Sequence, residues 1–362
     1  MTRVGMVATR CRPEIGGIES VVAEVAGRVV ARGYDLEVLT TDRSGRLPRV
    51  ERVDGYTVRR FRAYPASRDW YFSPGLFWAL LRRRYDLLHV QGIHTLVPPL
   101  AMLAALLRRT PYVLTFHTGG NSSAFRERAR STQWRVLSPL LRRARRLMGV
   151  SQYEARRFEE VLGLPPGGIA VVRNGGALPP VSPGVVPEPG LVVSVGRVER
   201  YKGHHRAVAA LPYLLKVRPD ARLEVLGSGP YEDELRRLAA ELGVADRVEV
   251  RLVPPDDRSA MADTLARAGV MVLLSDYEAH PVAVMEALAL GRPAVVARTS
   301  GLTELEELGW ALGVDVDASA EETARAIERQ LDDPVRPAVE ALPTWETSVA
   351  GVVDTYQSVL AR

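Results

Sequence analysis

Strand-like segments alternate with helix-like segments along this chain of 362 residues, and the alternation constrains its fold more than any other feature. The first strand-like run, residues 4–9, is followed at residues 18–32 by valines at helical spacing. In the first half of the chain the expected strands are residues 4–9, 36–40, 86–90, 112–116 and 147–150. Strands that alternate with helices pair in parallel, because a crossover helix must return the chain to the same edge of the sheet. The sequence therefore predicts an α/β fold.

A stretch rich in proline and glycine interrupts this alternation. The sixteen residues from Gly175 to Gly190 contain five prolines and four glycines, a composition typical of a linker. The alternation then resumes, with expected strands at residues 191–195, 222–226, 247–252, 270–274 and 293–297. We therefore expect two parallel-sheet domains, with a cleft for ligands between them, beyond the carboxyl ends of the strands. The expected boundaries are an N-terminal domain of residues 1–175, a linker of residues 176–190, a C-terminal domain of residues 191–344, and a final helix within residues 345–362 that joins the N-terminal domain.

The segment after the expected strand 270–274 carries the most specific pattern. Glu278 lies in its loop and Glu286 one turn into the next helix, and Pro281 suits a first helical turn because its missing N–H costs nothing there. No acid occupies the first helical positions, which begin with Val282 and Ala283, so the positive end of the helix is open to an anion. Glu286 is placed to accept hydrogen bonds from hydroxyls, for example those of a ribose. A capping acid and a surface acid are the structural alternative.

A second cationic pattern follows the expected strand 191–195. Gly196 and Arg197 come first, and Lys202 follows five residues after Arg197. Arginine offers a planar fork and lysine a compact point charge, so the two could converge on one diphosphate. Lys202 and Lys216 are the only lysines among 48 basic residues, and a lysine at this place favours function over two solvated surface cations.

Two further segments follow strands in the N-terminal half. Gly16 and Gly17 precede the first helix, where backbone N–H groups can approach an anion or form only a flexible turn. His117 follows the expected strand 112–116, and it could donate a hydrogen bond, stabilise positive charge, or be a satisfied structural histidine. By contrast, His204 and His205 are expected at the surface beside Lys202.

Composition excludes several classes of protein. The net charge of +5 and an aromatic content of 6% give no basis for a nucleic-acid partner. The single cysteine, Cys11, forms no internal disulfide and no cysteine metal cluster, and no carboxylate or histidine cluster indicates a metal site. The N-terminus reads as a strand rather than a signal peptide, which favours a cytoplasmic protein. The segment Arg126–Arg146 carries eight arginines and one acid, and it is either an amphipathic helix attracted to anionic lipid at the inner membrane face or a solvated arginine face.

Taken in their order along the chain, these motifs resemble those of the retaining glycosyltransferases of the GT-B fold, specifically family 4. The resemblance rests on Gly196-Arg197 with Lys202-Gly203, on Glu278 and Glu286 with seven residues between them, on Asn174-Gly175 before the linker, and on the early Gly16-Gly17. It covers nearly the whole chain. It implies two Rossmann-like domains facing an interdomain cleft, with a nucleotide-sugar held mainly by the C-terminal one.

The resemblance also implies roles for single residues. Arg197 and Lys202 would hold the diphosphate and stabilise the leaving group, Glu286 would bind ribose hydroxyls, and Glu278 would contact the donor sugar. Of the remaining residues, His117 would lie near the donor sugar and Gly17 near the phosphates. His280 stands where the family often has an aromatic residue, so it would tune the preference for the donor sugar.

The resemblance implies an enzyme that moves a sugar from a nucleoside diphosphate to an acceptor hydroxyl with retention, using neither a metal nor another cofactor. The acceptor stays open between a small molecule, a natural-product intermediate and a glycolipid. A nucleotide-sugar epimerase of the same architecture and a non-catalytic nucleotide-sugar-binding protein are the alternatives. The intact set Arg197, Lys202, Glu278 and Glu286 favours transfer over both.

Overall fold

The computed structural model describes residues 1–14, 16–68, 70–118, 124–254 and 257–361, with only the backbone of residues 124–132. The chain divides into two compact units. The N-terminal unit contains residues 1–118, 125–173 and 345–362, and the C-terminal unit contains residues 174–344. The final helix α12 (Trp345–Leu360) is therefore part of the N-terminal unit, although it follows the whole C-terminal unit in sequence.

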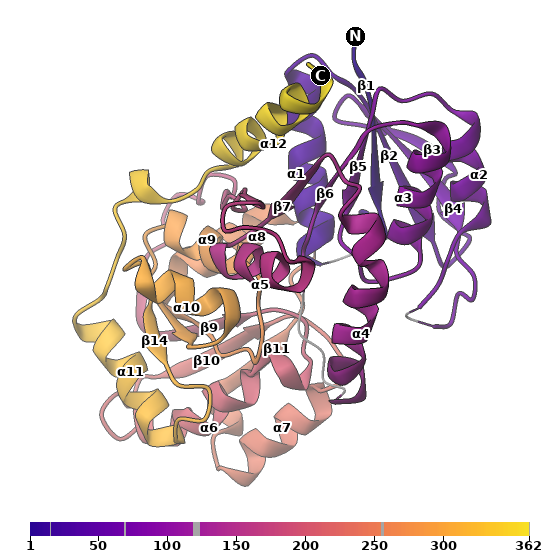
Figure 1. Cartoon of the computed structure of the whole chain (residues 1–362). Helices are drawn as coiled ribbons and strands as arrows, with labels where there is room; N and C mark the ends of the chain where they lie inside the picture. Colours follow the sequence, from indigo (N-terminus) through magenta and orange to yellow (C-terminus); the bar gives the residue numbers. More distant parts are fainter. Residues whose placement is uncertain (15, 69, 119–123, 255–256, 362) are drawn as a thin grey trace. The chain divides into compact units, whose positions relative to one another are not determined.

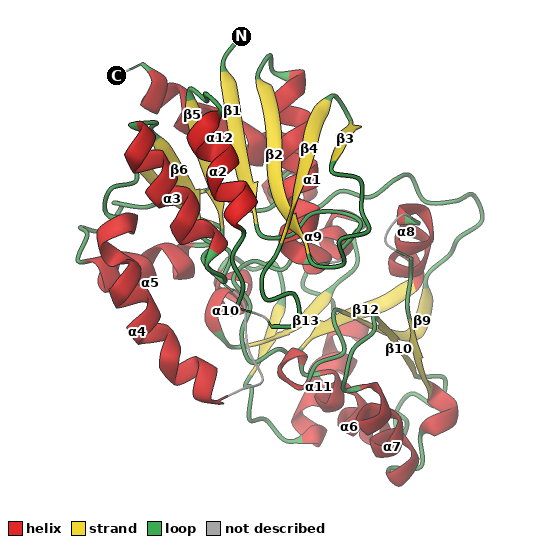
Figure 2. Cartoon of the chain, turned by 90° about the vertical axis from the view of Figure 1, so that its right-hand side faces the viewer, coloured by secondary structure: helices red, strands yellow, loops and turns green. Residues whose placement is uncertain are grey.

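The N-terminal unit is built on an eight-stranded sheet with the order β3-β4-β2-β1-β5-β6-β7-β8. All neighbours pair in parallel except β3 and β4, which are antiparallel. The strands are β1 (Arg3–Ala8), β2 (Asp35–Asp42), β3 (Val50–Val53), β4 (Tyr56–Arg62), β5 (Leu87–Gln91), β6 (Tyr112–Thr115), β7 (Arg146–Gly149) and β8 (Ala170–Val171). Its helices are α1 (Gly17–Ala31), α2 (Pro74–Arg82), α3 (Val97–Arg108), α4 (Ala124–Leu141), α5 (Gln152–Leu162) and α12. Helices α2 and α3 lie together over one face of this sheet (Figure 2).

Burial explains why the central strands were visible in the sequence and the edge strands were not. Strands β1 and β5 consist of buried residues over almost their whole length, because helices cover both faces of a parallel sheet. Strand β3 at the sheet edge is largely exposed and charged, and β4 alternates buried with half-exposed residues. These two strands were not predicted, because their charged residues interrupt the apolar pattern. Helix α2 was also not predicted, although its sequence is largely apolar.

The C-terminal unit contains a six-stranded parallel sheet with the order β11-β10-β9-β12-β13-β14. Strands β9, β10, β11 and β14 of this sheet are labelled in Figure 1. Its strands are β9 (Glu188–Val195), β10 (Arg222–Leu226), β11 (Val248–Arg251), β12 (Ala268–Leu273), β13 (Ala294–Ala297) and β14 (Leu312–Val314). Its α-helices are α6 (His204–Leu214), α7 (Glu232–Glu241), α8 (Arg258–Arg267), α9 (Val282–Ala289), α10 (Ser300–Glu307) and α11 (Ala320–Asp332), with the short 3-10 helices η1 (Arg200–Lys202), η2 (Ala245–Arg247) and η3 (Val339–Ala341). Strand β9 begins at Glu188, inside the range expected to be linker.

Helix α12 packs on the first helix of the N-terminal unit. The side chain of Glu346 accepts a hydrogen bond of 3.1 Å from Arg28 on α1. Farther along the helix, the ring of Tyr356 is fully buried, and it contacts Tyr34 edge to face. The burial of one apolar face thus fixes the end of the chain to the N-terminal unit. No helix among the described residues is both long enough and apolar enough to cross a membrane.

Candidate active site

The loop between β12 and α9 carries Glu278, which forms a partly buried ion pair with Lys202 in the C-terminal unit. The Lys202 ammonium donates a hydrogen bond of 2.5 Å to Glu278, whose same oxygen also accepts a 2.9 Å bond from the Ser275 hydroxyl. Burial by itself would lower the pKa of Lys202, but the adjacent carboxylate outweighs this effect and raises it above the ordinary value. Lys202 is therefore a fixed cation, and Glu278 is its counter-charge.

Glycine and backbone contacts fix Lys202 in this place. Gly203 adopts the left-handed conformation at φ 73°, and a Cβ there would lie 1.9 Å from the carbonyl oxygen of Leu274. Only glycine allows this approach. The Asp276 N–H donates a 2.7 Å bond to the Tyr201 carbonyl, so the turn that carries Lys202 is joined to the loop that carries Glu278.

Arg197 lies on the same turn but is far more exposed. Its guanidinium contacts Glu199 at 2.5 Å and donates a 3.0 Å bond to the hydroxyl of Tyr201. The preceding residue, Gly196, is crossed closely by another backbone, since a Cβ on Gly227 would lie 1.9 Å from its carbonyl oxygen. The structure thus brings Arg197 and Lys202 together on one glycine-bounded turn after β9.

Glu286 is buried within α9 and forms an ion pair with Arg258 from α8. We expected Glu286 to be placed for ligand hydroxyls, and its carboxylate already has this cationic partner. Arg258 was missed in the sequence. The sequence marks Arg258 only weakly, because this residue is one of many arginines and its helix follows an edge strand.

The N-terminus of α9 contains no acid in its first turn and no capping side chain. Pro281 is the N-cap, and the carbonyl of the preceding His280 accepts a 3.0 Å bond from the side chain of Asn174. Gly176 lies against the same helix, where a Cβ would come within 2.3 Å of the carbonyl carbon of Met285. Asn174, His280, Pro281, Val282, Ala283 and Glu286 thus converge at this helix within one unit. The free backbone N–H groups and the helix dipole favour an anion there.

A second helix start in this unit shows the opposite arrangement. Helix α7 follows the Gly227-Ser228-Gly229 turn, and its Glu232 carboxylate accepts a 2.9 Å bond from the Gly229 N–H. That carboxylate occupies the place an anion would take.

The prediction that His204 lies at the surface was wrong. His204 is 1% exposed, its Nδ1 lies 2.8 Å from the Ser194 hydroxyl, and burial lowers its pKa to about 4.

In the N-terminal unit, His117 is held by a network of neutral side chains. Its Nε2 lies 2.7 Å from Oε1 of Gln91, and the Nε2 amide of Gln91 lies 3.2 and 3.4 Å from the two ring nitrogens of His89. His89 also contacts the Thr115 and Tyr356 hydroxyls at 2.7 Å. Burial lowers the pKa of both histidines to about 3, so both rings are neutral at pH 7.

This network decides which nitrogen of His117 carries its proton. The amide nitrogen of Gln91 is nearly equally distant from the two ring nitrogens of His89, so it lies over the face of that ring. An N–H is favourable over an aromatic face, whereas a carbonyl oxygen is not. The Gln91 oxygen therefore faces His117 and accepts from its Nε2–H. The lone pair of the neutral ring is then on Nδ1, so His117 can accept a hydrogen bond from a hydroxyl.

The backbone around His117 is also constrained. Its φ of 148° is unusual for a residue with a side chain, and the ring of His94 lies 2.5 Å from its carbonyl oxygen. The next residue, Thr118, donates two bonds to the fully buried Glu154, from its N–H at 2.7 Å and from its hydroxyl at 2.6 Å. Ring, carbonyl and following residue are thus each held separately, as expected of a residue whose position matters.

Gly16 and Gly17 begin helix α1, as the sequence suggested. Gly17 has open space where a Cβ would be, whereas a Cβ on Gly16 would lie 2.2 Å from a carboxylate oxygen of Glu19. Glu19 is buried in the first turn of the helix. Its charge opposes a phosphate at this helix end, in the same way as that of Glu232 in the other unit.

The basic stretch Arg126–Arg146 falls partly outside the described side chains. In its described part, Trp134, Leu137 and Leu141 are buried on one face of α4, and Arg135 and Val136 are exposed. This spacing is that of a helix with one face in the core.

Solved structures of the same fold identify the class of protein first. Sucrose-phosphate synthase from Thermosynechococcus elongatus covers 100% of both chains with a TM-score of 0.79 and 23% identity. The Anabaena protein HepE in complex with UDP and glucose covers 99% of this chain and 100% of its own, with a TM-score of 0.78 and 19% identity. The fold is therefore GT-B, two Rossmann-like parallel-sheet domains.

Sequence relatives then identify the family. The model of Glycosyltransferase Family 4 matches residues 15–176, and that of Glycosyl transferases group 1 matches residues 181–342. A D-inositol 3-phosphate glycosyltransferase of Acidothermus cellulolyticus is 30% identical over 99% of this chain and 91% of its own length. A GDP-mannose:cellobiosyl-diphosphopolyprenol alpha-mannosyltransferase of Xanthomonas oryzae pv. oryzae is 28% identical over 99% and 97%. The chain belongs to the group 1, family 4 glycosyltransferases, and the predicted family and enzyme class are confirmed.

Proposed function

We propose that this glycosyltransferase takes its sugar from a nucleoside diphosphate, transfers it to an acceptor hydroxyl with retention of configuration, and requires no metal. The observation that carries the proposal is the partly buried Lys202–Glu278 pair in the unit that also has the acid-free N-terminus of α9. A fixed cation and an open helix start in one unit suit a diphosphate better than any neutral ligand. Two solved structures of similar fold support this donor class, those of HepE in complex with UDP and with UDP-glucose.

The transfer step breaks the bond between the sugar C1 and the diphosphate oxygen. Negative charge develops on that oxygen, and Lys202, Arg197 and the N–H groups at the start of α9 stabilise it. The acceptor oxygen forms its bond to C1 from the same face, and its proton passes to the leaving phosphate oxygen. In this proposal Glu278 keeps Lys202 in place and contacts the donor sugar, and the Nδ1 atom of His117 accepts a hydrogen bond from a substrate hydroxyl.

Glu286 takes the ribose in this proposal. Its buried carboxylate is paired with Arg258, and a carboxylate can accept hydrogen bonds from two vicinal hydroxyls. The neutralisation of the diphosphate is assigned to Arg197 and Lys202 rather than to a divalent cation.

We place the reaction in the cytoplasm. A reduced Cys11 is compatible with that compartment, and the basic stretch Arg126–Arg146 could meet anionic lipid there.

The test is a donor screen followed by analysis of the product. We expect one or a few nucleoside-diphosphate sugars to raise the melting temperature and to be consumed when an acceptor is present. The anomeric configuration in the product, measured by NMR, should equal that of the donor, and the rate should be unchanged by excess EDTA. An inverted product or strong, metal-reversible inhibition by EDTA would contradict the proposal, and conversion of the donor sugar without acceptor would indicate an epimerase.

A further inference from the structure

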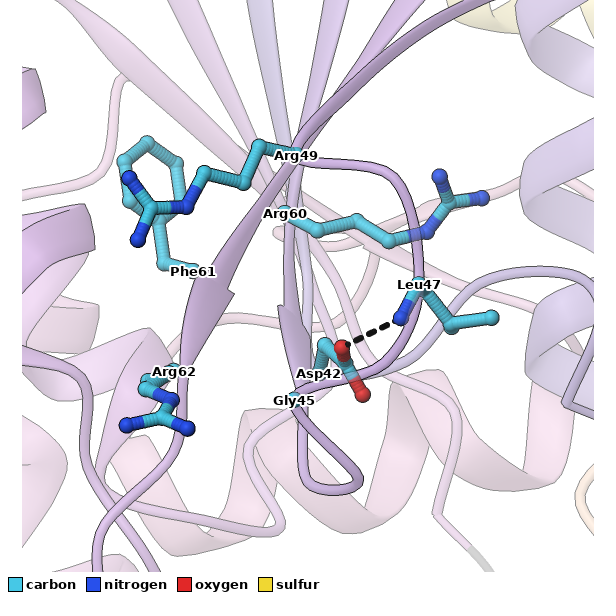
Figure 3. A pocket seen from close by; sticks show the side chains of 7 residues that line it. All are labelled: Asp42, Gly45, Leu47, Arg49, Arg60, Phe61 and Arg62. Atoms are coloured by element: carbon cyan, nitrogen blue, oxygen red, sulfur yellow. Dashed lines mark hydrogen bonds between the residues drawn. The ribbon is translucent and has the colours of Figure 1, made fainter.

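A hollow in the N-terminal unit lies at the carboxyl ends of β2 and β4, away from every residue assigned above (Figure 3). It is lined by Asp42, Gly45, Leu47, Arg49, Arg60, Phe61 and Arg62. We propose that this arginine hollow binds a phosphate or diphosphate group of the acceptor. The assignment to an acceptor rests on the proposed transferase function, whereas the anion site stands on the geometry and charge of the hollow itself.

The charges in the arginine hollow are unbalanced. Three of its lining residues are arginines, and Asp42 is its single acid. Arg49 and Arg62 are exposed, and neither guanidinium forms an ion pair with a carboxylate anywhere in the described residues. In Figure 3 these two arginines lie on the opposite side of the view from Arg60 and Leu47. Two unpaired guanidinium groups offer the planar donor forks that bind phosphate oxygens.

The single acid of the hollow is turned toward its own loop. The Asp42 carboxylate accepts bonds from the Ser44 N–H at 2.8 Å, the Ser44 hydroxyl at 2.7 Å and the Leu47 N–H at 3.0 Å. Burial alone would raise the pKa of Asp42, but these hydrogen bonds lower it, so the group stays ionised. Asp42 thus organises the loop rather than neutralising Arg49 or Arg62.

The third arginine holds the other side of the loop. The buried Arg60 guanidinium donates to the carbonyl oxygens of Pro48 at 3.2 Å and Arg12 at 2.9 Å, and it pairs with Glu51 at 2.7 Å. Gly45 adopts φ 68°, and a Cβ there would lie 3.1 Å from a terminal nitrogen of Arg62. The loop is therefore held from both sides before any ligand binds, which reduces the entropy lost on binding.

The sheet order sets the distance between this hollow and His117. Both lie at the carboxyl edge of the same parallel sheet, the edge at which such folds bind ligands. Strands β2 and β4 are three and four strands away from β6, and at about 4.8 Å per strand this is about 15–20 Å. The hollow therefore suits the anionic end of an elongated acceptor whose reacting hydroxyl is remote from its phosphate.

The decisive experiment measures binding of inorganic pyrophosphate to the full chain by isothermal titration calorimetry. All proteins carry Arg197→Gln and Lys202→Ala, which removes the cations assigned to the donor. We expect the added double variant Arg49→Gln, Arg62→Gln to weaken pyrophosphate binding at least tenfold. The matched control is Arg52→Gln on β3, an exposed arginine outside the hollow, and it should change binding less than twofold. Equal weakening by the control, or unchanged binding in the double variant, would overturn the proposal.

A second measurement separates this site from the transferase function. In the otherwise native chain, the double variant should raise KM for a phosphorylated acceptor at least tenfold and leave acceptor-independent hydrolysis of the donor unchanged. An unchanged KM would overturn the acceptor assignment even if transfer proceeds normally. A soluble phosphate ester and a lipid-linked diphosphate share this chemistry. Sedimentation of the wild-type chain with phosphatidylglycerol vesicles distinguishes the two. Only a lipid-linked acceptor requires the chain to bind the vesicles.

Discussion

The two units hold their candidate residues by opposite means. In the C-terminal unit, two ion pairs fix the site, Lys202 with Glu278 and Arg258 with Glu286. In the N-terminal unit, His117 is fixed by the neutral side chains of Gln91 and His89. A site that stabilises a departing diphosphate needs permanent positive charge, whereas a site that contacts a neutral hydroxyl needs a lone pair in a fixed direction. The predictions below test this contrast, from the largest expected effect to the smallest.

Replacing Lys202 should have the largest effect, because it removes the cation that is paired with Glu278 in the C-terminal unit. We expect Lys202→Ala to reduce transfer about 10³-fold while circular dichroism and the unfolding transition show a folded protein. The matched control is Lys216→Ala, the other lysine of the chain, whose ammonium lies 4.8 Å from the centre of the Tyr213 ring and should be dispensable. Near-normal turnover of Lys202→Ala would remove this residue from the site.

The Arg258–Glu286 pair should show strong coupling. Arg258→Gln leaves the buried Glu286 carboxylate without its cation, and we expect the free energy of unfolding to fall by about 2–3 kcal/mol, below the full cost for a buried pair because Arg258 is partly exposed. Adding Glu286→Gln should restore part of this loss. Urea unfolding of the two single variants and the double variant measures the coupling, and strictly additive effects would show that the pair is not an energetic unit.

The two buried histidines of the N-terminal unit should make the free energy of unfolding depend on pH in a defined window. His89 and His117 have folded pKa values of about 3 against an ordinary value near 6.5, so between these values the unfolded chain binds protons that the folded chain does not. Stability is then full above pH 6.5 and decreases as the pH falls, by up to about 1.4 kcal/mol per pH unit for each histidine. Urea unfolding at pH 7, 6 and 5 measures the slope. His89→Gln should reduce this slope by the contribution of one histidine. An unchanged slope would show that His89 titrates normally.

Gln91 should matter for the orientation of His117 rather than for charge. We expect Gln91→Leu to lower kcat about tenfold with little change in the KM for the donor, because the ring loses the acceptor that fixes its proton on Nε2. Gln91→Glu places a carboxylate there, which raises the pKa of His117 and moves the acid limb of the pH–rate profile upward. Nitrogen NMR of the histidine tautomers checks the cause directly, and an Nδ1–H tautomer in the wild-type protein would contradict the assignment.

The sequence alone gave a large part of the fold, for a physical reason. Strands such as β1, β5, β9 and β12 are buried on both faces, so they read as apolar runs between helices, and their positions were predicted within a few residues. The exposed edge strand β3 carries little such signal and was missed. Lys202 was recognised because it combines an uncommon residue type with a place directly after a strand.

Partners distant in sequence were beyond any local pattern. Arg258 is an ordinary polar residue in sequence, and Gln91 is marked there only by its place at the end of a strand. The packing of α8 on α9, and of β5 beside β6, gives the two residues their partners. His204 was misjudged because its burial depends on Ser194 in the strand before it.

The sequence by itself determined the two parallel sheets, the linker region and the motif residues after the strands, because hydrophobic periodicity and turn residues act over short distances along the chain. The tertiary structure decided which charges are paired, which tautomer His117 adopts, and where unpaired arginines gather. Those properties depend on burial and on contacts between residues far apart in sequence, such as the 2.5 Å contact of Lys202 with Glu278 and the 2.7 Å contact of His89 with Tyr356.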